Sequence, residues 1–153
     1  MSSSSALPPD AAAPFAALVG AFFRAVSFEP PGSPDYAAIR DLFIEDGRLI
    51  KNSGASPDIA DVEAFIAPRQ GLVDRGELTQ FSEVETAAIT EVFGNVAHRL
   101  STYEKTGTQD GVSTSGRGVI STQFVRTPAG WRMSVMAWDD ERPGLELPER
   151  YRA

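Results

Sequence analysis

The single histidine of the chain, His98, is the first candidate for acid–base chemistry. An imidazole has a pKa near neutrality, so it can accept and donate protons at physiological pH. Alternation along a predicted strand places His98 on the same face as Val96 and Leu100. Glu104 shares this face, but about 20 Å of strand lies between it and His98, which is too far for a dyad. We predict His98 as the catalytic residue if this face lines a pocket, and otherwise as a hydrogen-bonded histidine of the sheet or of an interface.

Two further side chains have the chemistry to orient a ligand. The hydroxyl of Tyr103 can donate a hydrogen bond to a ligand carbonyl. The guanidinium of Arg69 can hold a carboxylate through two parallel hydrogen bonds at the mouth of an apolar pocket. We predict both residues as ligand-binding. The alternatives are a tyrosine that packs within a strand and an arginine that is simply solvated.

Three consecutive carboxylates, Asp139, Asp140 and Glu141, are of the type that hard cations prefer. Neighbouring side chains of a strand point to opposite faces, so these three do not converge on one ion. We expect a solvated end of the sheet, where Asp139 or Asp140 pairs with Arg132 or Arg142. The chain has no cysteine, which excludes thiolate ligands and disulfides. We predict no metal and no cofactor.

The aromatic side chains are candidates for the wall of a pocket. Trp131 and Trp138 are seven residues apart, so strict alternation sends them to opposite faces of a strand. We predict that Trp138 lines the pocket together with Phe22, Phe43 and Phe65. Core packing alone is the alternative for all of them, because aromatic rings bury large areas.

The composition limits the classes of partner. Fourteen Lys+Arg against 21 Asp+Glu give a net charge of −7, which repels nucleic-acid backbones and acidic membrane surfaces. No apolar run approaches the roughly 18 residues that span a bilayer, and the first residues lack the positive charge of a secretion signal. We therefore predict a cytoplasmic protein that binds neither nucleic acid nor membrane.

The elements that must position these residues change character along the chain. Apolar residues recur at helical spacing over 10–26. Serine–proline pairs at 33–34 and 56–57 predict the starts of a second and a third helix, and Pro68 should end or kink the third. A short strand is expected at 48–51.

The second half predicts four strands rich in β-branched and aromatic residues, at 81–93, 96–103, 115–126 and 131–139. Gly94-Asn95 and the turn over 127–130 predict two tight hairpins, and a mobile hairpin tip is expected over 105–114. The fold class is therefore α+β, with three N-terminal helices packed on a curved, largely antiparallel sheet. We predict this domain over 10–141, a flexible N-terminal extension over 1–9 and a tail containing proline and glycine over 142–153.

Three stretches resemble the nuclear transport factor 2-like superfamily, which includes ketosteroid isomerase and polyketide cyclases. They are DYAAIRDLF (35–43) followed by Asp46-Gly47, then GNVAHRLSTYE (94–104) and GWRMSVMAWDDE (130–141). The resemblance covers about residues 12 to 141. It implies a cone-shaped α+β barrel with an internal pocket, and often a homodimer packed through the outer face of the sheet.

The catalytic pattern of ketosteroid isomerase is missing at the positions that match it. The aspartate base of that family falls on Lys51 or Ile50, and its tyrosine on Phe22 or Phe23. The stretch 118–123, where its second acid is expected, contains no carboxylate. Steroid isomerisation by that mechanism is therefore not expected.

Three functions stay open at this point. The leading hypothesis is a cone domain that binds a small hydrophobic ligand, forms a homodimer through the outer sheet face and has no assignable activity. The second is an acid–base isomerase, cyclase or dehydratase acting on a hydrophobic carbonyl compound, with His98 transferring the proton. The third is a non-catalytic interaction domain, whose cone is filled by its own side chains.

Overall fold

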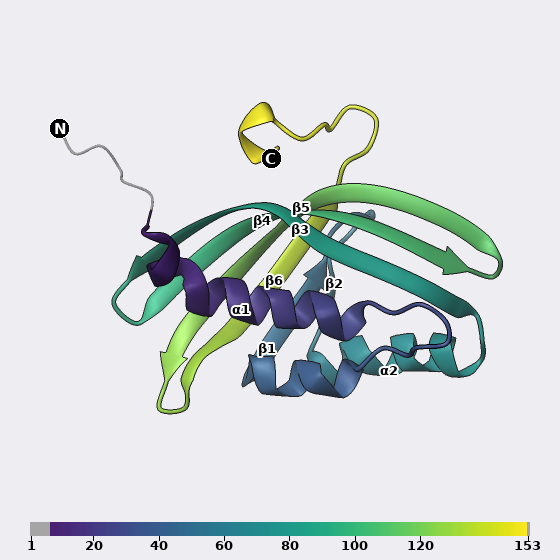
Figure 1. Cartoon of the computed structure of the whole chain (residues 1–153), viewed down its shortest axis with the longest axis horizontal. Coiled ribbons are helices and arrows are strands. Elements are labelled where there is room, and N and C mark those ends of the chain that lie inside the picture. Colours follow the sequence, from purple (N-terminus) through teal and green to yellow (C-terminus); the bar gives the residue numbers. More distant parts are fainter. Residues whose placement is uncertain (1–6, 153) are drawn as a thin grey trace.

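The computed structural model describes residues 7–152 and has an α+β architecture (Figure 1). The elements follow in the order α1 (Pro9–Val26), η1 (Tyr36–Leu42), β1 (Phe43–Lys51), β2 (Asp58–Ala60), α2 (Val62–Asp74), β3 (Leu78–Phe93), β4 (Val96–Gln109), β5 (Val112–Thr127), β6 (Gly130–Asp140) and η2 (Glu149–Tyr151), where η marks a 3-10 helix. Six strands form one curved sheet in the order β2-β1-β6-β5-β4-β3. β3 to β6 are antiparallel neighbours, whereas β1 runs parallel to β6.

The four-strand meander confirms the predicted strands, although all four are longer than expected. β4 continues to Gln109 and β5 begins at Val112, so the expected hairpin tip contracts to a tight turn. Asp110 and Gly111 form this turn with φ values of 52° and 78°, a conformation that glycine and aspartate tolerate. Lys105 lies in the part of β4 that extends beyond the predicted strand.

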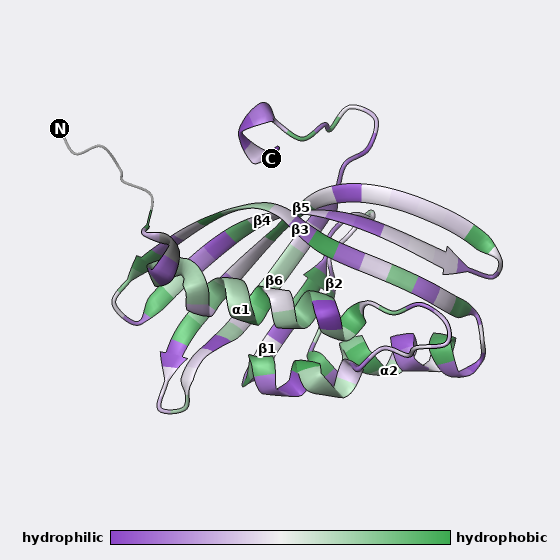
Figure 2. Ribbon diagram, viewed as in Figure 1, coloured by the Kyte–Doolittle hydropathy of each residue, from purple (hydrophilic) through white to green (hydrophobic). Residues whose placement is uncertain are grey.

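The helices cover one face of the sheet, and the core lies between them. Figure 2 shows hydrophobic and hydrophilic residues alternating along the long strands, as expected for a sheet with one covered face. The buried cluster combines side chains of α1 with inner-face side chains of the strands, among them Phe15, Val19, Phe22, Phe124, Met133 and Met136. Phe15 contacts both Phe124 and Trp131 edge to face, with ring centroids 4.9 Å apart in each case. This packing anchors α1 across β5 and β6.

The prediction of three N-terminal helices is confirmed only in part. The first helix is present as α1, but the second is the 3-10 helix η1, and the third follows β1 and β2. α2 begins after Asp61, whose side chain accepts a hydrogen bond from the backbone N–H of Ala64 at 2.8 Å. That cap replaces the one expected at Ser56. α2 also continues through Pro68, because the proline removes only its own N–H from the helix while Phe65 stays buried against the core.

The C-terminal segment lies on the face of the sheet opposite the helices (Figure 1). Thr102, an outer-face residue of β4, donates a hydrogen bond to the carbonyl of Tyr151 at 2.5 Å, and Leu147 is buried. The N-terminal extension predicted over 1–9 falls mostly outside the described residues. Within residues 7–152, none of the helices is both long and apolar enough to cross a bilayer.

Candidate functional site

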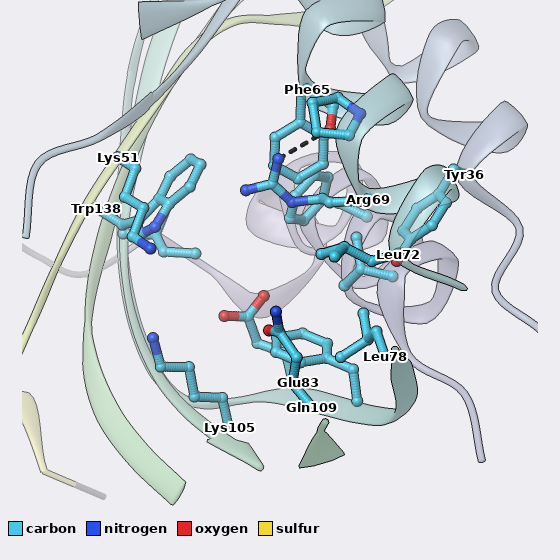
Figure 3. Close-up of a pocket in the computed structure, with 15 residues that line it drawn as sticks. Tyr36, Lys51, Phe65, Arg69, Leu72, Leu78, Glu83, Lys105, Gln109 and Trp138 are labelled. Carbon is cyan, nitrogen blue, oxygen red and sulfur yellow. Dashed lines mark hydrogen bonds between the residues drawn. The ribbon is translucent and has the colours of Figure 1, made fainter. Parts of the chain in front are cut away.

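A cavity of about 360 Å³ lies between the two α-helices and the inner face of the sheet (Figure 3). Apolar side chains from every layer contribute to its wall, including Phe22, Val26, Phe65, Leu72, Phe81 and Trp138. Six polar side chains also line it: Tyr36, Lys51, Arg69, Glu83, Lys105 and Gln109. A largely apolar cavity with a few convergent polar groups is typical of a small-molecule site.

Glu83 projects from β3 into this cavity, and its backbone position is set by α1. The hydroxyl of Ser27 accepts a hydrogen bond from the backbone N–H of Glu83 at 3.0 Å and donates to the carbonyl of Phe23 at 2.6 Å. Glu83 pairs across the strands with Lys105, so both side chains lie on the inner face. None of the described residues donates a hydrogen bond to the Glu83 carboxylate.

Burial raises the pKa of Glu83 to about 7, against the lowering effect of Lys105 and the smaller one of Arg69. A carboxyl group with such a pKa is present in both protonation states at neutral pH. It can therefore accept a proton from a ligand and return one.

Arg69 lies on α2, one turn after Phe65. Its guanidinium stacks over the Phe65 ring, 3.6 Å from the ring centroid, and its Nη1 donates to the Phe65 carbonyl at 2.9 Å. Burial lowers the pKa of Arg69, which has no ion-pair partner among the described residues. The Nε and Nη2 groups are left free to donate to a ligand.

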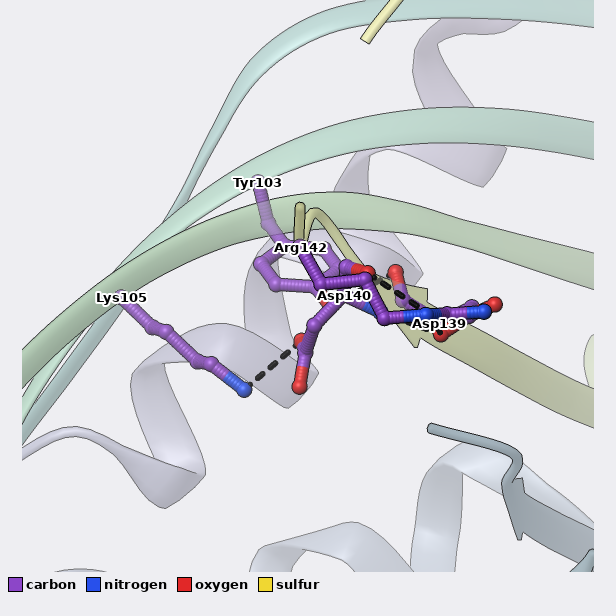
Figure 4. A network of polar contacts seen from close by, with 5 residues as sticks. All are labelled: Tyr103, Lys105, Asp139, Asp140 and Arg142. Atoms are coloured by element: carbon purple, nitrogen blue, oxygen red, sulfur yellow. Dashed lines mark hydrogen bonds and ion pairs between the residues drawn. The ribbon is translucent and has the colours of Figure 1, made fainter. Parts of the chain in front are cut away.

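Lys105 is held at the cavity by a network behind its wall (Figure 4). Its Nζ donates to the Asp140 carboxylate at 2.8 Å, and the hydroxyl of Tyr103 donates to the same carboxylate. These hydrogen bonds keep the pKa of Asp140 below its ordinary value, although burial acts in the opposite direction. Gly118 makes room for the network, because a Cβ at this position would collide with Tyr103 and with the Asp139 carbonyl.

The predicted site residues lie in three places: the cavity wall, the buried core and the outer face of the sheet. The wall contains Phe22, Phe65, Arg69 and Trp138. Phe43 is buried in the core without lining it.

Tyr103 is fully buried behind the cavity and supports Asp140, so its hydroxyl does not face a ligand, contrary to our prediction. The missing side chain of Gly118 lets the ring lie against the sheet.

The position of His98 requires a correction. His98 lies on the outer face of the sheet, opposite the cavity, where it pairs with Glu91 of β3 at 2.6 Å. Both side chains are more than half exposed. The reason is alternation: Ala97, Arg99, Ser101 and Tyr103 take the inner face of β4, which leaves His98 outside. It is therefore unable to transfer a proton within the cavity.

The three consecutive carboxylates separate into three ion pairs. Asp139 pairs with Arg142 at 2.5 Å, which confirms one of the predicted pairings, and Asp140 pairs with Lys105. Glu141 pairs with Arg117 at 2.8 Å. Within residues 7–152, no group of three or more acidic or histidine side chains is arranged to hold a metal ion.

Sequence reasoning missed Glu83 and Lys105. Both lie in long strands in which charged residues are frequent, and only the register shows that they form a cross-strand pair facing inward. Lys51, one of the two positions that we matched to the aspartate of ketosteroid isomerase, lines the cavity beside Trp138, its neighbour across β1 and β6. A charged residue at a position that the family uses for catalysis was thus the signal in the sequence that pointed to a polar group in the cavity wall.

No family model and no curated protein matches the sequence. Solved structures do match over most of the chain. A proposed aromatic ring hydroxylase from Novosphingobium aromaticivorans has a TM-score of 0.71 at 19% identity, covering 90% of this chain and 93% of its own.

A nuclear transport factor 2-like superfamily protein from Salmonella enterica serovar Typhimurium has a TM-score of 0.69 at 13% identity, covering 85% and 90% of the two chains. The hexachlorocyclohexane dehydrochlorinase LinA-type3 from Novosphingobium barchaimii also has a TM-score of 0.69, at 12% identity, covering 87% and 88%. At identities this low, the similarity shows a shared fold and does not indicate a shared activity. The chain is therefore similar in fold to proteins of the nuclear transport factor 2-like superfamily.

Proposed function

We propose that the cone cavity binds a small hydrophobic carbonyl compound and that Glu83 moves a proton to and from it, as in an acid–base isomerase. The observation that carries this proposal is the Glu83 carboxylate, which points into a largely apolar cavity without a hydrogen-bond donor of its own among the described residues. A carboxylate in this setting is unsatisfied until a ligand arrives. It replaces His98 as the group that transfers the proton.

The proposed step is a proton shift within the substrate. Glu83 removes a proton from the carbon next to the carbonyl, the electron pair of that C–H bond forms the enolate, and Glu83 returns the proton to another atom of the same system. Cationic and hydroxyl groups of the cavity, Lys105, Arg69 and Tyr36, are available to stabilise the enolate oxygen. No atom is gained or lost overall, so no co-reactant is needed.

The same fold carries enzymes with other activities, because the dehydrochlorinase from Novosphingobium barchaimii has it. That similarity supports a catalytic use of the cavity but does not transfer a reaction. A cavity of about 360 Å³ also argues against the third sequence hypothesis, in which side chains fill the cone.

Deuterium uptake from solvent tests the proposal through the proton transfer itself, so the product need not be identified. The protein is incubated in D₂O with a panel of small ketones with and without a carboxylate group, such as levulinate and phenylacetone, and incorporation at the carbon next to the carbonyl is followed by mass spectrometry. We expect uptake to be accelerated by the unmodified chain and lost in Glu83→Gln. Glu104→Gln is the matched control, because Glu104 lies exposed on the neighbouring strand and on the opposite face.

Uptake that persists in Glu83→Gln would refute the assignment of Glu83. Panel compounds that bind in the cavity without any accelerated exchange would refute the acid–base function itself.

We also propose that two copies pair through the outer face of the sheet. Ile89, Phe93 and Val96 form an apolar strip on β3 and β4 of this face, and Phe93 is 86% exposed. Large exposed apolar side chains that lie together are typical of an association surface. A second copy would cover the strip with the same strip of its own, as a two-fold axis requires.

A further inference from the structure

The charges around the cavity do not cancel, although the whole chain is acidic with a net charge of −7. Three cationic side chains line the cavity, and one of them, Lys105, is neutralised by Asp140. Among the lining residues, Lys51 and Arg69 then face only Glu83, while Asp58, which acts on Arg69 and pairs across the strands with Lys51, does not line the cavity. The lining side chains, with Asp140 counted against Lys105, therefore carry a net charge of about +1 when Glu83 is ionised and about +2 when it is protonated, so the lining favours an anionic ligand.

Arg69 is prepared to bind that anion. Stacking on Phe65 and the bond from Nη1 to the Phe65 carbonyl fix the plane of its guanidinium without using an acidic partner. Figure 3 shows the guanidinium extending into the cavity above the Glu83 carboxylate. A partly buried guanidinium with free Nε and Nη2 donors is unfavourable when empty, and a planar carboxylate satisfies it through two parallel hydrogen bonds.

The other side chains of the cavity wall limit the size and the chemistry of the rest of the ligand. Phe22, Phe65 and Trp138 supply aromatic surface, with Phe65 contacting Trp138 edge to face at 6.2 Å between ring centroids. The volume of about 360 Å³ is at the small end of ligand cavities. It therefore suits one ring or a short branched chain better than a fused-ring skeleton.

We propose that the ligand of this cavity is a small hydrophobic monocarboxylate and that Arg69 binds its carboxylate group. The inference rests on the proposed function only in treating this ligand as the substrate, whose carbonyl or adjacent C–H then lies near Glu83. Arg69 is in this respect a specificity-determining residue. Lys51 adds long-range attraction from the exposed side of the cavity.

The test compares a carboxylate with its neutral isostere. Titration calorimetry measures the Kd of 3-phenylpropionate and of 3-phenylpropionamide for the unmodified chain, Arg69→Gln, Arg69→Lys and Arg75→Gln. Arg75 ends the same helix but forms an exposed pair with Glu77 outside the cavity, which makes it the matched control.

We expect the unmodified chain and Arg75→Gln to prefer the carboxylate about tenfold or more, the range of one charged hydrogen-bonded pair. Arg69→Gln should lose that preference, and Arg69→Lys should recover part of it because it keeps the charge without the planar fork. Thermal unfolding of each variant verifies that it is folded.

Equal affinity for acid and amide in the unmodified chain would overturn the proposal, as would an undiminished preference in Arg69→Gln. Glu83→Gln separates this failure from failure of the proposed function. That variant should bind 3-phenylpropionate at least as well as the unmodified chain, because it lacks the negative charge of Glu83 near the ligand. It should at the same time lose the deuterium uptake measured with the ketone panel. A carboxylate preference without any exchange would leave the binding site standing and remove the acid–base function.

Discussion

Replacing Glu83 by glutamine should change how the stability of the fold depends on pH. The ordinary pKa of a glutamate, 4.5, applies to the unfolded chain, whereas burial raises that of folded Glu83 to about 7. Between these two values the folded state binds more protons than the unfolded state, so stability falls as pH rises. Glutamine has no such proton and keeps the stability that the unmodified chain loses.

The size of the effect follows from the two pKa values. From low to high pH, this difference in pKa lowers the free energy of unfolding of the unmodified chain by about 3.4 kcal/mol. About 2.5 kcal/mol of that change falls between pH 5 and pH 8. Solvent reaches the partly exposed side chain and screens the charge, so we expect a change of about 1–2.5 kcal/mol. When the pH is raised from 5 to 8, the free energy of unfolding of Glu83→Gln should therefore rise by this amount relative to that of the unmodified chain.

Urea unfolding followed by circular dichroism at pH 5, 6, 7 and 8 measures the difference in unfolding free energy at each pH. Glu104→Gln is again the control, because its side chain lies in solvent and the same change removes no buried charge. A difference between Glu83→Gln and the unmodified chain that is constant over this range would refute the reasoning. A difference that shrinks as pH rises would show that the folded state favours the ionised carboxylate.

Two further predictions concern the sheet. Gly118→Ala should destabilise the fold by about 1–3 kcal/mol in urea unfolding, because its Cβ collides with Tyr103. Gly54→Ala is the control and should have little effect, because nothing lies within 4 Å of a Cβ at this position. Equal losses of stability in the two variants would contradict the prediction. Phe93→Asp should shift the chain from dimer to monomer in sedimentation velocity without lowering its stability, because Phe93 is 86% exposed. A dimer unchanged by Phe93→Asp, or a monomer from the start, would remove the outer-face interface.

The order of secondary structure could be read from the sequence because it depends on local pattern. Helical spacing over 10–26 and alternation with turn residues at Gly94-Asn95 and Gly130 predicted α1 and the strand meander. Exceptions occurred where tertiary packing outweighed a local signal. α2 continues through Pro68 because Phe65 and Ile66 are held in the core, whatever the preference of the proline.

The chemistry of the cavity depended on facts that no local pattern contains. Sequence alone established an acidic chain without cysteine, aromatic residues able to line a pocket, and Arg69 as a candidate for binding a carboxylate. It did not reveal that β4 turns His98 outward or that Glu83 and Lys105 face each other inside. A shift of one residue in strand register exchanges the two faces of a strand, so the three-dimensional pairing alone decided which charged side chains entered the cavity.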